Sequence, residues 1–160
     1  MTKRTVLVVD DEEMIRRACA RALAPVFHVI EAETLAAAER ALESGNVDVC
    51  LTDVRLPDGD GVERLSSLRR QSPRTIFVFM TGHGGVESAV AAVKGGAYDF
   101  LTKPFDSIDE VSIAVGKALE HKDLRDMADR LQSEADRRAG FDAVIGGSGA
   151  MAKAGGVARD

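Results

Sequence analysis

Five side chains that could do chemistry stand at or just beyond the ends of short apolar runs. Asp10 and Asp11 follow the run at 5–9, and Asp53 follows the run at 47–52. Thr81 follows the run at 75–80, and Lys103 lies just beyond the run at 97–101. If the runs are parallel strands, their carboxyl ends meet at one edge of a sheet, and we expect the five side chains to gather there. Three carboxylates in one place repel one another, and a cation between them would offset that repulsion.

An oxygen-rich site of this kind suits magnesium, which keeps several waters and accepts one or two carboxylates together with phosphate oxygens. Asp53 can then act as a nucleophile toward a phosphoryl group, while Lys103 supplies positive charge and the Thr81 hydroxyl donates a hydrogen bond. Backbone amides of residues 82–84 would favour the same negative charge. A lone aspartate at a strand end is usually a helix cap or turn residue, and a lone lysine before proline is usually solvated. The prediction of phosphoryl-transfer chemistry therefore depends on all five residues occurring together.

The apolar runs alternate with helix-like stretches along the chain. The runs are 5–9, 26–30, 47–52, 75–80 and 97–101, and the helical stretches are 12–23, 34–44, 61–71, 86–94 and one that starts near 107. Most runs are continuously apolar, which is typical of strands that helices cover on both faces. The pattern predicts an α/β fold with a doubly wound, five-stranded parallel sheet in the flavodoxin-like strand order 2-1-3-4-5.

Composition and charge restrict the class of protein. The 160 residues give room for one domain of ordinary size and some extra chain. No apolar run approaches the roughly 20 residues that span a membrane. The formal charge of −5 argues against direct DNA binding, which requires clustered Lys and Arg. Cys19 and Cys50 lack metal-site spacing, and the N-terminus does not resemble a secretory signal, so we expect reduced thiols and a cytoplasmic location.

The character of the sequence changes after residue 121. Residues 122–139 are charged and helical in pattern, with a narrow apolar stripe that includes Leu124, Met127 and Leu131. This stripe fits a short coiled-coil seam or a solvated helical linker equally well. Glycine and alanine then dominate, which predicts a flexible tail. The expected divisions are a main domain over 1–121, a helical linker over 122–139 and a tail over 140–160.

Four segments resemble the signature segments of receiver domains, the phosphoacceptor domains of two-component signalling. They are VLVVDDE at 6–12, LTDVRLPDGDG at 51–61, TGHG at 81–84 and KPF at 103–105. The resemblance covers about residues 4–121 and implies a CheY-like fold with a helical extension after it. It also implies a switch and not an enzyme. A sensor histidine kinase would supply the phosphoryl group, and the domain would catalyse its own phosphotransfer and a slow autodephosphorylation.

The resemblance implies a magnesium site around the phosphoacceptor. Asp53 would accept the phosphoryl group, with Lys103 as a catalytic partner. Asp11, Asp53 and the backbone carbonyl of Arg55 would bind Mg²⁺ directly, and Asp10 would act through a water molecule.

The resemblance further implies a conformational switch. Thr81 and Phe100 match the family's switch pair, in which the hydroxyl moves toward the phosphoryl group and the aromatic ring turns inward. The output surface would comprise the fourth helix, the fifth strand and the fifth helix, over about Val86–Leu119. We expect this surface and the helical linker to control formation of a homodimer. The Lys103–Pro104 peptide bond would be cis.

Residues 82–90, together with residues 95–101, most resemble receivers of the nitrogen-regulator (NtrC-like) class, which are sigma-54-dependent regulators. Residues 144–151, VIGGSGAM, resemble the start of the AAA+ module of those regulators. The sequence then departs from the module, because it contains no phosphate-binding loop of the form G-x-x-x-x-G-K-[S/T] and no recognisable DNA-reading helix pair. Control of transcription would therefore need an effector module that this sequence lacks, either because the sequence is a fragment or because the effector has been lost.

Three other functions share parts of this pattern. Haloacid-dehalogenase-like phosphatases combine an aspartate nucleophile with magnesium, but residues 53–55 lack the second aspartate of their Asp-x-Asp motif. Flavin or nucleotide modules bind at the same sheet edge, yet the acidic residues 10–12 would repel a phosphate. A receiver that signals without phosphorylation would not need the acidic pocket, Thr81 and Lys103.

Overall fold

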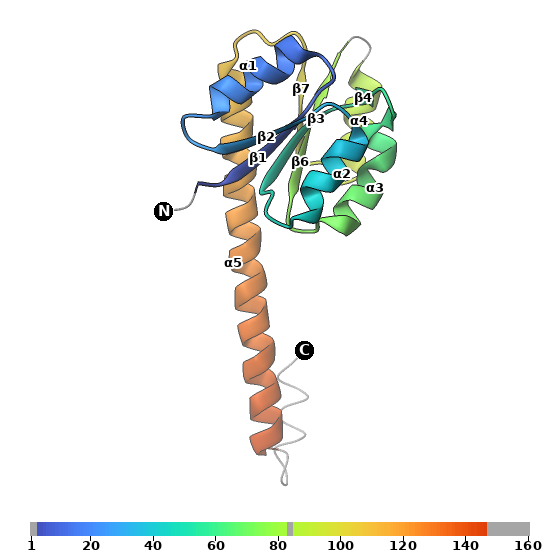
Figure 1. The fold of residues 1–160 in the computed structure, drawn as a ribbon. Coiled ribbons are helices and arrows are strands. Elements are labelled where there is room, and N and C mark those ends of the chain that lie inside the picture. The colour runs from blue at the N-terminus through green and yellow to red at the C-terminus, as the bar shows by residue number, and fades with distance from the viewer. Residues whose placement is uncertain (1–2, 83–84, 147–160) are drawn as a thin grey trace. The chain divides into compact units, whose positions relative to one another are not determined.

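The computed structural model describes residues 3–82 and 85–146, in which strands and helices alternate (Figure 1). The strands are β1 (Thr5–Val9), β2 (His28–Ala32), β3 (Val49–Asp53), β4 (Arg55–Leu56), β5 (Gly59–Asp60), β6 (Ile76–Thr81) and β7 (Asp99–Thr102). The helices are α1 (Glu13–Leu23), α2 (Leu35–Glu43), α3 (Gly61–Gln71), α4 (Gly85–Lys94) and α5 (Asp109–Gly146).

The main sheet has the order β2-β1-β3-β6-β7, and all of its neighbouring strands are parallel. This confirms the predicted order 2-1-3-4-5, because the two-residue strands β4 and β5 pair only with each other, as a small antiparallel hairpin after β3. The register pairs Val9 with both Ala32 and Thr52, and it pairs Asp53 with Met80. The central strands therefore end close to one another, at a single edge of the sheet.

Helices cover both faces of the sheet, as the continuous apolar runs predict (Figure 1). Alternate residues of β1 point to opposite faces, so Leu7 and Val9 belong to one apolar cluster and Val6 and Val8 to the other. The first cluster includes residues of α2, α3 and α4, and the second includes residues of α1 and α5. Both sides of the sheet are thus fixed by apolar packing, which leaves its edge available for polar side chains.

The second predicted strand is displaced by two residues relative to β2. Residues 26–30 were expected, but β2 spans His28–Ala32, because Val26 and Phe27 form the turn after α1. The N–H groups of both residues donate to the carbonyl of Leu23, and the Val26 side chain is 63% exposed. The apolar pattern placed the strand too early because this turn itself contains apolar residues.

The described chain contains two compact units, and the second begins at Asp123. Helix α5 is continuous over Asp109–Gly146, so the expected last helix and the expected linker helix are one element. Residues 140–146, which were assigned to the expected tail, continue helix α5. One glycine costs a helix only about 1 kcal/mol relative to alanine, and no proline follows Gly140 to stop the helix. Residues 147–160 of the predicted tail lie outside the described residues.

The apolar stripe of the second unit is exposed. Leu124, Met127 and Leu131 are each about half or more exposed, which leaves both the seam and the solvated linker as predictions. Among residues 3–82 and 85–146, no helix has the length and apolar character that crossing a membrane requires.

Candidate functional site

Three carboxylates cluster at the carboxyl edge of the sheet. Asp10 and Asp11 follow β1 and Asp53 ends β3, and one carboxylate oxygen from each lies within 4.8 Å of the others. Asp10 is fully buried, Asp53 is nearly so and Asp11 is exposed. The sequence therefore predicted correctly which acidic residues meet, because each lies at the end of a strand or just beyond it and the register brings these ends to one edge.

Lys103 provides the positive charge of this cluster. Its Nζ donates to Asp53 Oδ2 at 3.0 Å, to Asp10 Oδ2 at 3.1 Å and to Glu12 Oε1 at 3.3 Å. The Lys103 side chain is 9% exposed, so its contacts to Asp10 and Asp53 form largely out of solvent, whereas the Glu12 side chain is 60% exposed. The Lys103–Pro104 peptide bond is cis, which confirms that prediction.

The pKa values of the cluster reflect the competition between burial and charge. Burial disfavours the ammonium of Lys103, but hydrogen bonds from it to Asp53 and Asp10 and the charges of these groups outweigh that effect and raise its pKa. Burial raises the pKa of Asp10, and this effect is opposed by the Glu12 N–H, which donates to Oδ1 at 2.9 Å, and by Lys103. Lys103 is therefore held protonated, and its charge helps to keep Asp10 ionised.

The carboxylates open into a cleft of about 340 Å³. Its lining includes Asp11, Asp53, Arg55, Thr81 and Lys103. Thr81 is 2% exposed at the end of β6, and its carbonyl accepts the backbone N–H of Lys103 at 2.7 Å. Of the predicted backbone amides at 82–84, Gly82 lines the cleft, whereas residues 83–84 lie outside the described residues.

Phe100 lies apart from the cleft. It belongs to β7, pairs with Phe79 of β6 in the sheet register and is 39% exposed. The structure thus brings Thr81 to the cleft and leaves the ring of its predicted switch partner Phe100 on the surface.

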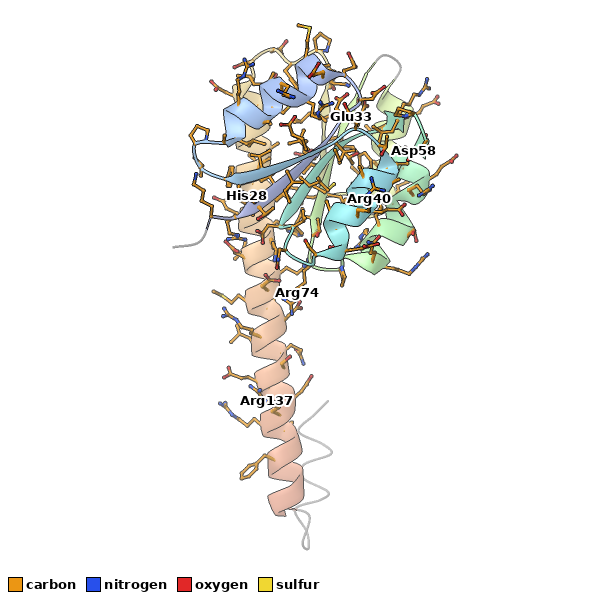
Figure 2. All side chains as sticks on the ribbon, in the orientation of Figure 1. His28, Glu33, Arg40, Asp58, Arg74 and Arg137 are labelled. Carbon is orange, nitrogen blue, oxygen red and sulfur yellow. The ribbon has the colours of Figure 1, made fainter. Side chains whose placement is uncertain are left out.

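Close backbone packing holds the segment after Asp53. A Cβ at Gly61 would lie 3.0 Å from the Asp53 carbonyl oxygen and 2.9 Å from a ring carbon of Phe79, so a larger residue would displace the end of β3 or the Phe79 ring. Asp60 caps α3 by accepting the N–H of Val62 at 2.8 Å. Asp58 lies near the start of α2 (Figure 2) and accepts the N–H groups of Leu35 and Ala36 there.

Sequence reasoning missed three residues that contact this site or its loops. Glu12 contacts Lys103, Asp58 joins the loop to α2, and Arg16 donates to the backbone carbonyl of Asp10. A signal existed for Arg16, because it is spaced with Cys19 and Leu23 on the buried face of α1, where an apolar residue is expected. No local pattern identifies Asp58, whose partners lie more than twenty residues away in the chain.

Comparison with known proteins decides the family. The profile of the response regulator receiver domain matches residues 6–115. The chain belongs to this family. This receiver domain is 36% identical over 121 residues to the regulatory protein AtoC of Escherichia coli (strain K12), covering 75% of this chain and 26% of AtoC. It is 38% identical over 122 residues to the transcriptional regulator NtrC of the same organism, covering 76% of this chain and 26% of NtrC.

Solved structures agree with this assignment. The beryllofluoride-activated NtrC4 receiver domain dimer is 39% identical, with a TM-score of 0.69, and the match covers 74% of this chain and 98% of that one. NtrX from Brucella abortus is 31% identical with a TM-score of 0.74, covering 82% of this chain and 29% of NtrX. The receiver domain is therefore of the NtrC-like class, and it spans about a quarter of the length of the regulators AtoC and NtrC.

Membership of the family determines the general function. Receiver domains are phosphorylation-dependent signalling switches of two-component systems, and they are not classical enzymes. The acidic pocket of Asp10, Asp11 and Asp53 is compatible with Mg²⁺.

Proposed function

We propose that this receiver domain accepts a phosphoryl group on Asp53 from a sensor histidine kinase. The observation that carries the proposal is the Asp53 carboxylate, which lines an open cleft with Lys103 Nζ only 3.0 Å from its Oδ2. A carboxylate so placed is reachable by a phosphodonor, and the ammonium beside it offsets the negative charge that the reaction adds.

The residues present fit a magnesium ion. Asp11 and Asp53 would bind it directly together with the backbone carbonyl of Arg55, and Asp10 would act through a water. Bound there, the ion would neutralise charge on the transferred group and on the carboxylates. The chemistry of the donor set supports this assignment. Carboxylate oxygens are hard ligands, and they suit Mg²⁺ better than they suit softer metals.

The chain's own groups carry the transfer. An Asp53 oxygen forms a bond to phosphorus as the bond between phosphorus and the donor's histidine nitrogen breaks, and that nitrogen keeps the electron pair. Lys103 holds its positive charge beside the incoming oxygens, and the Thr81 hydroxyl donates to one of them. Slow autodephosphorylation is the attack of water on the same phosphorus, which returns the Asp53 carboxylate and releases phosphate.

Phosphorylation then switches the surface. Roughly two negative charges appear beside Thr81 and Lys103 and draw both side chains inward. The ring of Phe100, which is exposed in this structure, fills the space that Thr81 leaves. The consequence is an altered output surface over Val86–Leu119, formed by α4, β7 and the first part of α5.

The partners follow from this scheme. The kinase docks at the cleft, and a second copy of the chain pairs through the output surface and the stripe of Leu124, Met127 and Leu131. The dimeric NtrC4 receiver supports this pairing by likeness. Transcription would be controlled by an effector module outside residues 1–160, and neither direct DNA binding nor membrane contact by this chain is part of the scheme.

Intact-mass spectrometry with acetyl phosphate and Mg²⁺ tests the proposal. The wild type should gain one phosphoryl group per chain, and Asp53→Asn should gain none. Asp129→Asn, which removes an exposed carboxyl on α5, is the matched control and should label like the wild type. Undiminished labelling of Asp53→Asn would overturn the assignment.

A further inference from the structure

Arg16 occupies a position on α1 where an apolar residue is expected. The buried residues of this helix are Arg16, Cys19 and Leu23, which share the face that packs on the sheet. Arg16 is only 5% exposed. Arginine is almost never buried to this degree unless its charge is paired, so its contacts explain its place.

The guanidinium joins the ends of two strands. Its Nη1 donates to the backbone carbonyl of Asp10, just beyond β1, at 3.0 Å. Its Nε donates to Glu31 Oε1, on β2, at 3.0 Å, and Nη1 lies 3.4 Å from Glu33 Oε1 in the loop after β2. Glu33, which is labelled in Figure 2, directly follows the last residue of β2. The planar fork of arginine makes these contacts in one geometry, which a lysine ammonium cannot reproduce.

Asp10 is held at every polar atom. Its N–H donates to the carbonyl of Ala32 at 3.1 Å, and its carbonyl accepts from Arg16. Its carboxylate accepts from the Glu12 N–H and from Lys103 Nζ. Arg16 is the contact that holds the Asp10 carbonyl from the α1 side, so it restrains the backbone from which the carboxylate extends.

A charged group at this site needs a reason beyond packing. Replacing a buried ion pair by apolar residues of similar size is often neutral or stabilising, so a helix that needed only to cover the sheet would be served equally well by methionine or leucine. The contact to the Asp10 carbonyl supplies the reason, because it acts on a residue of the carboxylate cluster and not on the apolar core.

We propose that Arg16 is a positioning residue that aims the Asp10 carboxylate at the divalent-cation site. This inference rests on the proposed magnesium site, in which Asp10 takes part. Arg16 touches neither the ion nor the phosphoryl group, and its effect reaches them only through Asp10.

Mg²⁺ titration followed by two-dimensional NMR measures the effect on the folded domain. Arg16→Met should weaken Mg²⁺ binding about tenfold, the usual cost of losing a group that orients a metal ligand. Arg17→Met is the matched control, because Arg17 is the next residue of the same helix and also contacts Glu31, at 3.4 Å, but it is 56% exposed. Its Mg²⁺ affinity should equal that of the wild type.

The Asp10→Asn background separates positioning from general stability. If Arg16 acts through Asp10, adding Arg16→Met to the Asp10→Asn variant changes its Mg²⁺ affinity by less than about twofold. The substitution should still lower the melting temperature in that background, because the packing and ion-pair contacts of Arg16 are lost in both. An equal, tenfold weakening in both backgrounds would overturn the proposal, and so would unchanged affinity of Arg16→Met in the wild-type background.

Arg16→Lys tests the proposal if the methionine variant does not fold. It keeps the charge beside Glu31 and Glu33 but loses the fork, so its Mg²⁺ affinity should still fall, and wild-type affinity would overturn the proposal. If the wild type itself does not bind Mg²⁺, the proposed metal site is wrong. If the wild type binds Mg²⁺ and the Arg16 variants bind it equally well, only the positioning role of Arg16 is wrong.

Discussion

Replacing Lys103 by methionine should destabilise the domain because it removes the cation from a buried carboxylate cluster. Methionine keeps an unbranched stem of similar length and deletes the charge. Asp10 is fully buried and the Asp53 side chain is 11% exposed, so both carboxylates would be left with little solvent to compensate them. Breaking a buried ion pair by removing one partner costs about 3–5 kcal/mol. Because the cleft opens to solvent, we expect the lower end, about 3 kcal/mol, or roughly 12 °C in melting temperature.

The loss should depend on pH and on Mg²⁺ in a defined direction. Burial raises the pKa of Asp10 in the folded state, and Lys103 opposes that rise. A raised carboxyl pKa means that stability is lost as pH rises through it, and removing Lys103 enlarges this loss. The difference in unfolding free energy between the variant and the wild type should therefore narrow as pH falls through the raised Asp10 pKa of the variant. Mg²⁺ should also reduce the difference in unfolding free energy between the variant and the wild type, because it supplies positive charge at the same carboxylates.

Urea and thermal unfolding measure this difference in stability. Far-UV circular dichroism is the probe, because the chain has no tryptophan whose fluorescence could report unfolding. Lys117→Met is the matched control, because Lys117 is an exposed lysine on α5, and it should change stability by less than about 0.5 kcal/mol. A loss for Lys103→Met below about 1 kcal/mol that does not vary with pH or Mg²⁺ would show that Lys103 does not stabilise the buried carboxylates.

Three further predictions concern the metal, the switch and a loop. Asp11→Ala should remove most of the weak Mg²⁺ affinity, and calorimetry that finds equal binding in variant and wild type would count against the site. Beryllofluoride should change the monomer–dimer equilibrium measured by sedimentation, and Thr81→Ala should abolish the change; an association constant that ignores beryllofluoride would exclude the coupling. The N–H groups of Leu35 and Ala36 hold the pKa of Asp58 below its usual value, so its stabilising contribution is present at neutral pH and is lost as pH falls through that lowered pKa. Asp58→Asn should accordingly cost about 1 kcal/mol or less at pH 7, and this cost should shrink as pH falls through the lowered Asp58 pKa; a cost that does not vary with pH would contradict this assignment.

The strand ends could be predicted from sequence because the chemistry-bearing residues directly follow continuously apolar runs. The predicted bounds of β1 and α3 agree with the structure, since Asp10 and Asp60 mark sharp changes from one element to the next. The gathering of Asp10, Asp11 and Asp53 then followed from parallel topology alone.

The remaining features depend on information that local patterns do not contain. Val26 is apolar yet exposed in a turn, so composition placed β2 too early. Gly140 opens the glycine- and alanine-rich stretch that was expected to be a tail, but α5 continues through it to Gly146. The contacts of Arg16 and Asp58 join residues that are distant in sequence, and only the folded chain brings them together.

Identification of the phosphorylated residue tests the central claim most directly. The domain is phosphorylated with acetyl phosphate and Mg²⁺, the acyl phosphate is reduced with borohydride to homoserine, and peptides are sequenced by mass spectrometry. We expect homoserine at position 53 and nowhere else. Homoserine at Asp10 or Asp11, or a phosphoryl group on any other side chain with Asp53 unmodified, would contradict it.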